Sequence, residues 1–197
     1  MTNKKTTLAF LILAVLPSLL ALVACNPLEN DSKSSTFILV ESMTGKDLTG
    51  GTASFLQSDV VSSAGAVFAD IAAATVRASM LDPAPILNPS GYSDIILDRY
   101  VVAYSRSDGR SRQGIDVPYS FEGSLTQLVK VGATATFSFV IVREVAKMEP
   151  PLIGLAQGIK EGVIEMTAKV DFYGHDLTNN KVTATGYLTI FFTNYAD

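Results

Sequence analysis

The chain has 197 residues, with 15 lysines and arginines, 19 aspartates and glutamates, and a net charge of −4. This mildly acidic balance does not provide the basic face that nucleic acids require, so we expect no nucleic-acid partner. One cysteine is present, which excludes a disulfide within the chain.

The first 24 residues have the order of a secretory signal. A short positive region with two lysines comes first, an uncharged apolar run extends from Leu8 to Val23, and the small residue Ala24 follows. The run has about 16 residues and contains Pro17, whereas a membrane-spanning helix needs roughly 20 apolar residues. We therefore predict a signal peptide over residues 1–24 in preference to a permanent transmembrane helix.

The residues Leu22, Val23, Ala24 and Cys25 resemble the lipobox of bacterial lipoproteins. The resemblance implies cleavage before Cys25, a thioether link from its sulfur to diacylglycerol, and acylation of the new amino group by a fatty acid such as palmitate. It implies a lipid-anchored protein of the bacterial cell envelope, with the membrane as its partner through these groups. In Gram-negative lipoproteins an Asp after the cysteine favours the inner membrane. Asn26 stands here, so the resemblance favours the outer membrane.

The mature chain is predicted to be one domain on a short tether. Residues 25–35 are polar and have no apolar periodicity, which predicts a lipidated N-terminus and a flexible tether. Loss of residues 1–24 removes two lysines and no acid, so 13 basic and 19 acidic residues remain, with a net charge of −6. The folded domain is predicted over residues 36–197, a length that can bury a core without disulfides.

The domain sequence is rich in β-branched and aromatic residues, and alternation of apolar and polar residues dominates over helical spacing. Strands separated by turns rich in Gly, Pro and Asn are expected over residues 37–41, 52–57, 94–106, 124–131 and 133–143. The segments 42–51 and 147–157 are predicted as loops. Residues 67–81 fit both a helix face and a strand face, and we favour the strand because its neighbours are strands.

The last two strands have the clearest pattern. From Ile164 to Tyr173 and from Val182 to Phe192, apolar residues alternate with polar ones on either side of a turn at residues 176–180. The pattern predicts a long antiparallel hairpin. About eight strands at short spacing indicate an all-β domain, a single antiparallel β-sandwich, with an antiparallel β-barrel as the alternative.

A second resemblance concerns the latter half of the chain. Arg106–Arg110, Gly114–Pro118, and the ending from Asp171–Gly174 through Ala184–Tyr187 are similar to segments of uncharacterised bacterial lipoproteins with immunoglobulin-like domains. The resemblance implies an immunoglobulin-like sandwich and brings no established activity with it.

The sequence shows no assembled catalytic or metal set, so we expect neither catalytic residues nor a cofactor. His175 is the only histidine, so the usual imidazole-rich zinc sites cannot be assembled. A Ser-His-Asp triad could use only His175, and the Gly-x-Ser-x-Gly spacing of a nucleophile elbow is missing. Carboxylates near strand ends leave a loop calcium site open as an alternative. These carboxylates are Asp94, Asp98, Asp116, Asp171 and Asp176.

Three arginines form the most concentrated charge feature. Arg106, Arg110 and Arg112 surround the turn at Asp108, and arginine forks bind phosphate and carboxylate groups in two-point fashion. They are candidates for contact with an anion or a partner. The interpretation that we favour is pairing with Asp98, Asp108 and Asp116, which keeps an edge soluble.

Together these patterns favour a lipid-anchored envelope protein whose domain is a non-catalytic binding or structural module. One alternative is an assembly or pilot lipoprotein that docks to an outer-membrane machine by adding a strand to a sheet edge. Another is a carbohydrate-active hydrolase that uses two loop carboxylates. The sequence does not identify a ligand or an envelope protein partner.

Overall fold

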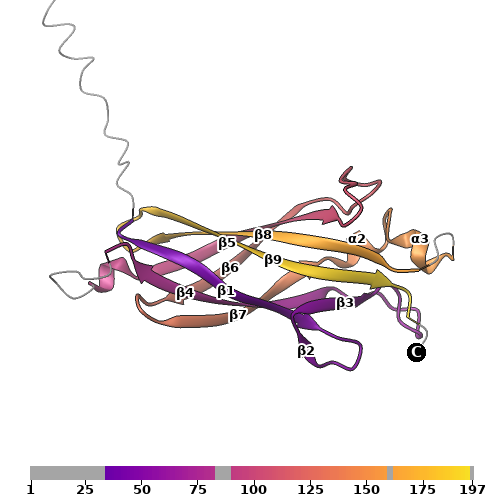
Figure 1. The fold of residues 1–197 in the computed structure, drawn as a ribbon, viewed down its shortest axis with the longest axis horizontal. Helices are drawn as coiled ribbons and strands as arrows, with labels where there is room; N and C mark the ends of the chain where they lie inside the picture. Colours follow the sequence, from indigo (N-terminus) through magenta and orange to yellow (C-terminus); the bar gives the residue numbers. More distant parts are fainter. Residues whose placement is uncertain (1–33, 83–89, 159–161, 196–197) are drawn as a thin grey trace, which may run out of the picture. The chain divides into compact units, whose positions relative to one another are not determined.

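The computed structural model describes residues 34–82, 90–158 and 162–195, which form two β-sheets packed face to face (Figure 1). One sheet has four strands in the order β2-β1-β4-β7, and the other has five in the order β3-β9-β8-β5-β6. The strand bounds are β1 Thr36–Lys46, β2 Thr52–Ala53, β3 Phe55–Asp59, β4 Asp70–Met80, β5 Ile95–Arg106, β6 Phe121–Val129, β7 Thr134–Val142, β8 Ile164–Asp176 and β9 Lys181–Thr193.

The strand order confirms the immunoglobulin-like sandwich, with nine strands where about eight were expected. Strands β1, β4 and β7 take the places of A, B and E in one sheet, and β9, β8, β5 and β6 take those of G, F, C and C′ in the other. The pairs are antiparallel except for β3, which runs parallel to β9. The chain therefore moves from one sheet to the other between β2 and β3.

Residues 67–81, whose sequence fits both a helical and a strand period, contain the strand that we favoured. Strand β4 pairs with β1 on one side and with β7 on the other, and its inward residues Ala72, Ala74, Val76 and Ala78 are buried. These small side chains are compatible with a helix by propensity, but pairing on both edges satisfies the backbone only in an extended chain.

The predicted C-terminal hairpin is confirmed as β8 and β9. The residues expected to face inward are buried on both strands. Gly186 lies on the inner face of β9, where a Cβ atom would lie 2.3 Å from the sulfur of Met43. The absence of a side chain there lets β1 pack closely on β9.

Two predicted loops differ from the structure. Strand β1 continues to Lys46, because the register shift between Val40 and Ser42 lets it stay paired with β4 through a segment of mixed polarity. The segment around Pro150-Pro151 contains two short helices, α2 Glu144–Lys147 and α3 Ile153–Ala156.

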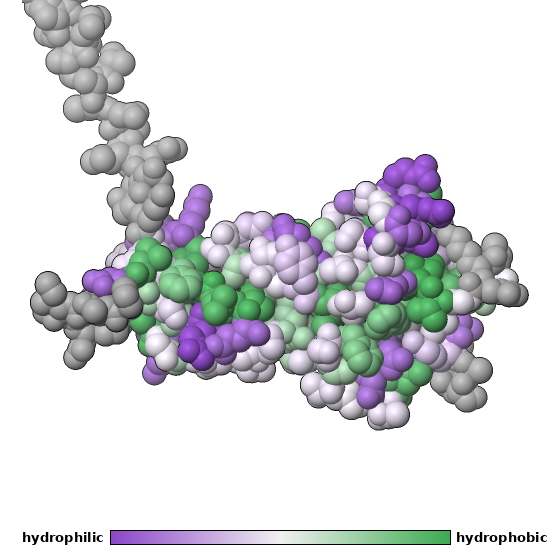
Figure 2. Space-filling model, viewed as in Figure 1, coloured by the Kyte–Doolittle hydropathy of each residue, from purple (hydrophilic) through white to green (hydrophobic). Residues whose placement is uncertain are grey.

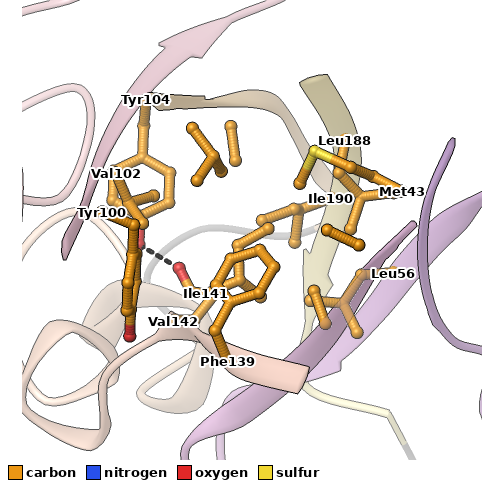
Figure 3. Close-up of a cluster of buried hydrophobic side chains, with 14 of the residues drawn as sticks. Met43, Leu56, Tyr100, Val102, Tyr104, Phe139, Ile141, Val142, Leu188 and Ile190 are labelled. Carbon is orange, nitrogen blue, oxygen red and sulfur yellow. Dashed lines mark hydrogen bonds between the residues drawn. The ribbon is translucent and has the colours of Figure 1, made fainter. Parts of the chain in front are cut away.

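Two tyrosines of β5 link the sheets across the core. The hydroxyl of Tyr104 donates to the carbonyl oxygen of Ile141 at 2.5 Å, and burial raises the pKa of Tyr104 (Figure 3). The ring of Tyr100 packs edge-on against Phe139 with ring centroids 5.1 Å apart. Gly123 of β6 leaves room for the Tyr100 ring, whose atoms would lie within 2.5 Å of a Cβ atom there.

The predicted signal peptide and the four lipobox-like residues, Leu22 to Cys25, lie outside the described residues. Two residues of the predicted tether, Ser34 and Ser35, take part in the domain. Ser34 is buried, and its hydroxyl accepts a hydrogen bond from the Thr36 amide. Among the described residues, no helix is long and apolar enough to cross a membrane.

Candidate binding surface at the loop end

The sandwich has two ends with different connections (Figure 1). We call the end where the described chain begins at Ser34 the amino end, and the opposite end the loop end. Two connections at the amino end have four residues each, Lys130–Ala133 and Leu177–Asn180. A third connection there, between β4 and β5, covers residues 81–94. The connections at the loop end include residues 60–69, 107–120 and 143–163, the last of which contains α2 and α3.

A buried ion pair joins the loop end to the sheets. Lys147, the last residue of α2, donates from Nζ to the Asp70 carboxylate at 2.8 Å and to the carbonyl oxygen of Asp59 at 2.8 Å. Ser58 of β3 donates to the other carboxylate oxygen of Asp70 at 2.6 Å. The Lys147 side chain is 2% exposed. The pair therefore ties α2 to the end of β3 and the start of β4.

Burial raises the pKa of Asp70, and the ammonium group of Lys147 opposes the increase. A desolvated charge of this kind is stable only while its partner is present. Ser58 has no exposed surface, so its hydroxyl is not positioned to reach a substrate. The three side chains thus position the loop end.

A surface pocket of about 330 Å³ lies close to this ion pair. Strand β3 runs parallel to β9 with Gln57 opposite Phe191, which places the side chains of both strands on one outer face. The rings of Phe55 and Phe191 meet edge to face, 5.8 Å apart at their centroids. The lining residues are Phe55, Gln57, Val163, Phe191 and Tyr195.

The polar groups of the pocket are an amide and a phenol. The Gln57 side-chain oxygen accepts from the Leu48 amide at 3.1 Å. Burial raises the pKa of Tyr195, and a hydrogen bond from Gln57 opposes the increase. The Tyr195 amide donates to the Asp59 carboxylate at 3.1 Å, so one residue connects the pocket wall to the segment that holds Lys147.

The chemistry of the pocket suits binding through rings and hydrogen bonds. Its volume lies at the lower limit of small-molecule sites, which are mostly apolar with a few polar groups. None of the five lining residues carries a carboxylate, an imidazole or a thiol. A mechanism with two carboxylates therefore gains no support from this pocket.

The three predicted arginines lie in or beside the loop-end connection of residues 107–120, and each contacts an acid. Arg106 and Arg110 both reach Asp108, at 2.8 and 3.6 Å, and Arg112 contacts Asp116 at 2.7 Å. A backbone hydrogen bond from Arg110 lowers the pKa of Asp108. The structure thus brings Arg106 and Arg110 together and gives Arg112 a separate partner.

The histidine and the carboxylates that the sequence offered as site candidates are dispersed over the domain. His175 lies in β8 with Nδ1 3.0 Å from the Asp176 carbonyl oxygen and Nε2 3.8 Å from the Asp98 carboxylate. Asp94 accepts from the Val131 amide, and Asp171 contacts Lys169. In the part of the chain that the structure describes, no three His, Cys, Asp or Glu residues gather closely enough to hold a metal ion.

The sequence indicated neither the pocket nor the ion pair. Phe55 and Phe191 have the spacing of ordinary strand residues, and only the parallel pairing of β3 with β9 brings them together. Lys147 lies in the segment 147–157, which the sequence predicts as a loop. No sequence signal distinguishes it from an exposed lysine.

No family model matches the chain, and searches of curated proteins and of solved structures give no match.

Proposed function

We propose that this protein is a lipid-anchored module of the bacterial cell envelope that binds a partner or ligand at its loop end. The observation that carries the proposal is the lipobox-like segment at residues 22–25 ahead of a chain that joins the sandwich at its amino end. Cleavage before Cys25 would leave nine residues, 25–33, before the first described residue. Nine extended residues reach at most about 30 Å.

Two fatty chains on diacylglycerol and a third on the amino group support stable membrane attachment, because each buried methylene contributes about 0.8 kcal/mol. Asn26 favours the outer membrane where two membranes exist. Since the domain has no cysteine beyond Cys25, the thiol is available for lipid attachment without any loss of a disulfide.

The loop end supports the binding role. It combines an open pocket with three aromatic rings and a connection with exposed arginines, and the buried Lys147–Asp70 pair fixes its helical segment. Aromatic and arginine side chains are enriched where proteins bind partners. The pocket offers ring surfaces, one amide and one phenol, which are groups that bind rather than transform a ligand.

Metabolic labelling with an alkyne analogue of palmitate tests the anchor. The wild-type chain is expected to incorporate the label and to appear in the membrane fraction of its host, whereas Cys25→Ala incorporates none and accumulates with residues 1–24 attached. Ser18→Ala, a change of similar size inside the apolar run, is the matched control and should label normally. Equal labelling of wild type and Cys25→Ala would contradict the proposal.

A further inference from the structure

The amino end carries large apolar side chains that the sandwich leaves exposed. Leu81 follows β4, Tyr92 lies in the short helix η1 Gly91–Ser93, and Leu177 begins the turn between β8 and β9. Their exposed fractions are 61%, 69% and 46%. Two connections, residues 81–94 and 177–180, thus present three large apolar side chains at the same end of the domain.

Hydrogen bonds hold these connections side by side around Ser35. The Leu81 amide donates to the Ser35 carbonyl oxygen at 2.8 Å, and the hydroxyls of Ser35 and Ser93 are 3.4 Å apart. The Leu177 amide donates to the Tyr92 carbonyl oxygen at 3.1 Å. The apolar side chains therefore surround the residue by which the chain joins the domain.

The apolar surface continues along the first strand. Phe37 and Leu39 point to the outer face of β1 and are 41% and 52% exposed. Figure 2 shows hydrophobic side chains over the beginning of β1, close to the amino end. The exposed apolar surface at the amino end is therefore larger than a single exposed leucine would provide.

The charges at this end are compatible with an uncharged or weakly anionic partner surface. The Asp94 and Asp176 carboxylates accept hydrogen bonds from neighbouring loop amides. Lys130 and Lys181 are exposed, as are the acids Asp82 and Asp98. The exposed charges balance, so apolar contact has to provide most of the binding free energy.

The length of the preceding chain indicates what lies opposite this surface. Nine residues link Cys25 to Ser34 and reach at most about 30 Å. Strand β9 alone has 13 residues and spans about 43 Å at the usual rise of a strand. A lipid on Cys25 therefore keeps the amino end closer to the bilayer than the loop end.

We propose that the amino end contacts the lipid surface, with Leu81, Tyr92 and Leu177 in the interfacial region of the bilayer. The proposal rests on the lipid anchor proposed above and adds an orientation to it. Tyrosine suits this environment because its ring is apolar and its hydroxyl stays hydrated, and leucine adds buried apolar area. The loop end, with its pocket, then faces away from the membrane.

The lack of tryptophan in the chain permits a direct test. Single substitutions Tyr92→Trp and Tyr119→Trp each place one fluorophore at an exposed tyrosine position, the first at the amino end and the second at the loop end. The full-length lipidated variants are reconstituted into vesicles of phosphatidylcholine with and without brominated acyl chains, which quench tryptophan at short range. Intact-mass measurement confirms the lipid on each variant.

We expect brominated lipid to quench Tyr92→Trp at least about twofold more strongly than Tyr119→Trp. The difference should shrink in Leu81→Glu/Leu177→Glu/Tyr92→Trp, because charged side chains oppose interfacial burial. Equal quenching at both positions in lipidated protein would overturn the orientation and leave the anchor intact. A mass without lipid on Cys25 would overturn the anchor, and the orientation with it.

Discussion

The connections between strands are stabilised by different interactions at the two ends of this sandwich. At the amino end, the buried Asp176 carboxylate closes the turn between β8 and β9 by accepting from the amides of Thr178 and Asn180, both at 2.9 Å. At the loop end, Lys147 and Asp70 form an ion pair away from water. The Asp176 turn is thus closed by groups within four residues of one another, whereas the ion pair joins residues 77 positions apart in the sequence.

This contrast predicts a large loss of stability when the buried pair is broken. Lys147→Met leaves the Asp70 carboxylate buried without its cation, and we expect the free energy of unfolding to fall by about 3–5 kcal/mol in urea titrations. Lys147→Met/Asp70→Asn should recover much of the loss, because the uncompensated charge is gone. Lys169→Met removes an exposed pair and should change little.

The pH dependence of the stability of Lys147→Met tests whether an uncompensated Asp70 charge causes the loss. Burial already raises the pKa of Asp70, and removal of Lys147 should raise it further. The folded variant then takes up a proton at a pH where the unfolded chain is still ionised. Its deficit relative to wild type should therefore narrow as the pH falls from 7 toward 4, and a deficit independent of pH would contradict the buried charge.

A smaller loss is expected at the amino end. Asp176→Ala removes hydrogen bonds to Thr178 and Asn180 within one turn, and we expect about 2 kcal/mol of destabilisation in the same titrations. Partial burial would raise the pKa of Asp176, but hydrogen bonds from Thr178 and Asn180 hold it below its ordinary value. Its contribution is thus present above about pH 4 and is lost as the pH falls through the lowered pKa.

That acid-sensitive loss should be missing from Asp176→Asn, in which the side chain no longer titrates. Below pH 4, wild type and Asp176→Asn are expected to converge in unfolding midpoint. If the two proteins instead lose stability in parallel, the turn does not depend on the charge of Asp176, and the contrast between the ends is wrong at this position.

The core hydrogen bond of Tyr104, which lies between the two ends, should have a smaller effect than either of these. Tyr104→Phe removes the hydroxyl that donates to Ile141, and we expect a loss of about 1 kcal/mol, since the ring stays in place. Urea titration measures it. Tyr187→Phe removes an exposed hydroxyl and serves as the control, with no loss expected.

Arg110 should matter least for stability. Arg110→Ala removes a 3.6 Å ion pair with a largely exposed guanidinium, so the unfolding midpoint should not move measurably. A clear loss of stability in this variant would show that the pair with Asp108 holds the 107–120 connection.

The sequence was sufficient to predict the sandwich because its strands carry a strong period of two. The inward alternation of β8 and β9 and the Asp108-Gly109 pair are local signals, and Gly109 has a positive φ of 82°, which is typical of an Asp-Gly turn. The extension of β1 to Lys46 was missed because a register shift interrupts its alternation after Val40. The two short helices were missed because four residues carry no helical period.

The candidate surface could not be predicted, because its residues come together only through pairing between segments that are distant in the sequence. Phe55 and Phe191 are 136 positions apart, and their meeting depends on β3 crossing to the second sheet. The burial of Lys147 depends on three segments converging at the loop end. By contrast, the arginine contacts with Asp108 and Asp116 are local, and the interpretation favoured from the sequence agrees with the geometry.

The division of roles between the two ends is tested most directly by photocrosslinking in intact cells. A photoreactive phenylalanine analogue replaces Phe191 in the pocket or Thr183, which lies on the same strand and face near the amino end. We expect a discrete crosslinked product from position 191 and none from position 183. Products of equal yield at both positions, or a product at position 183 alone, would contradict this division of roles.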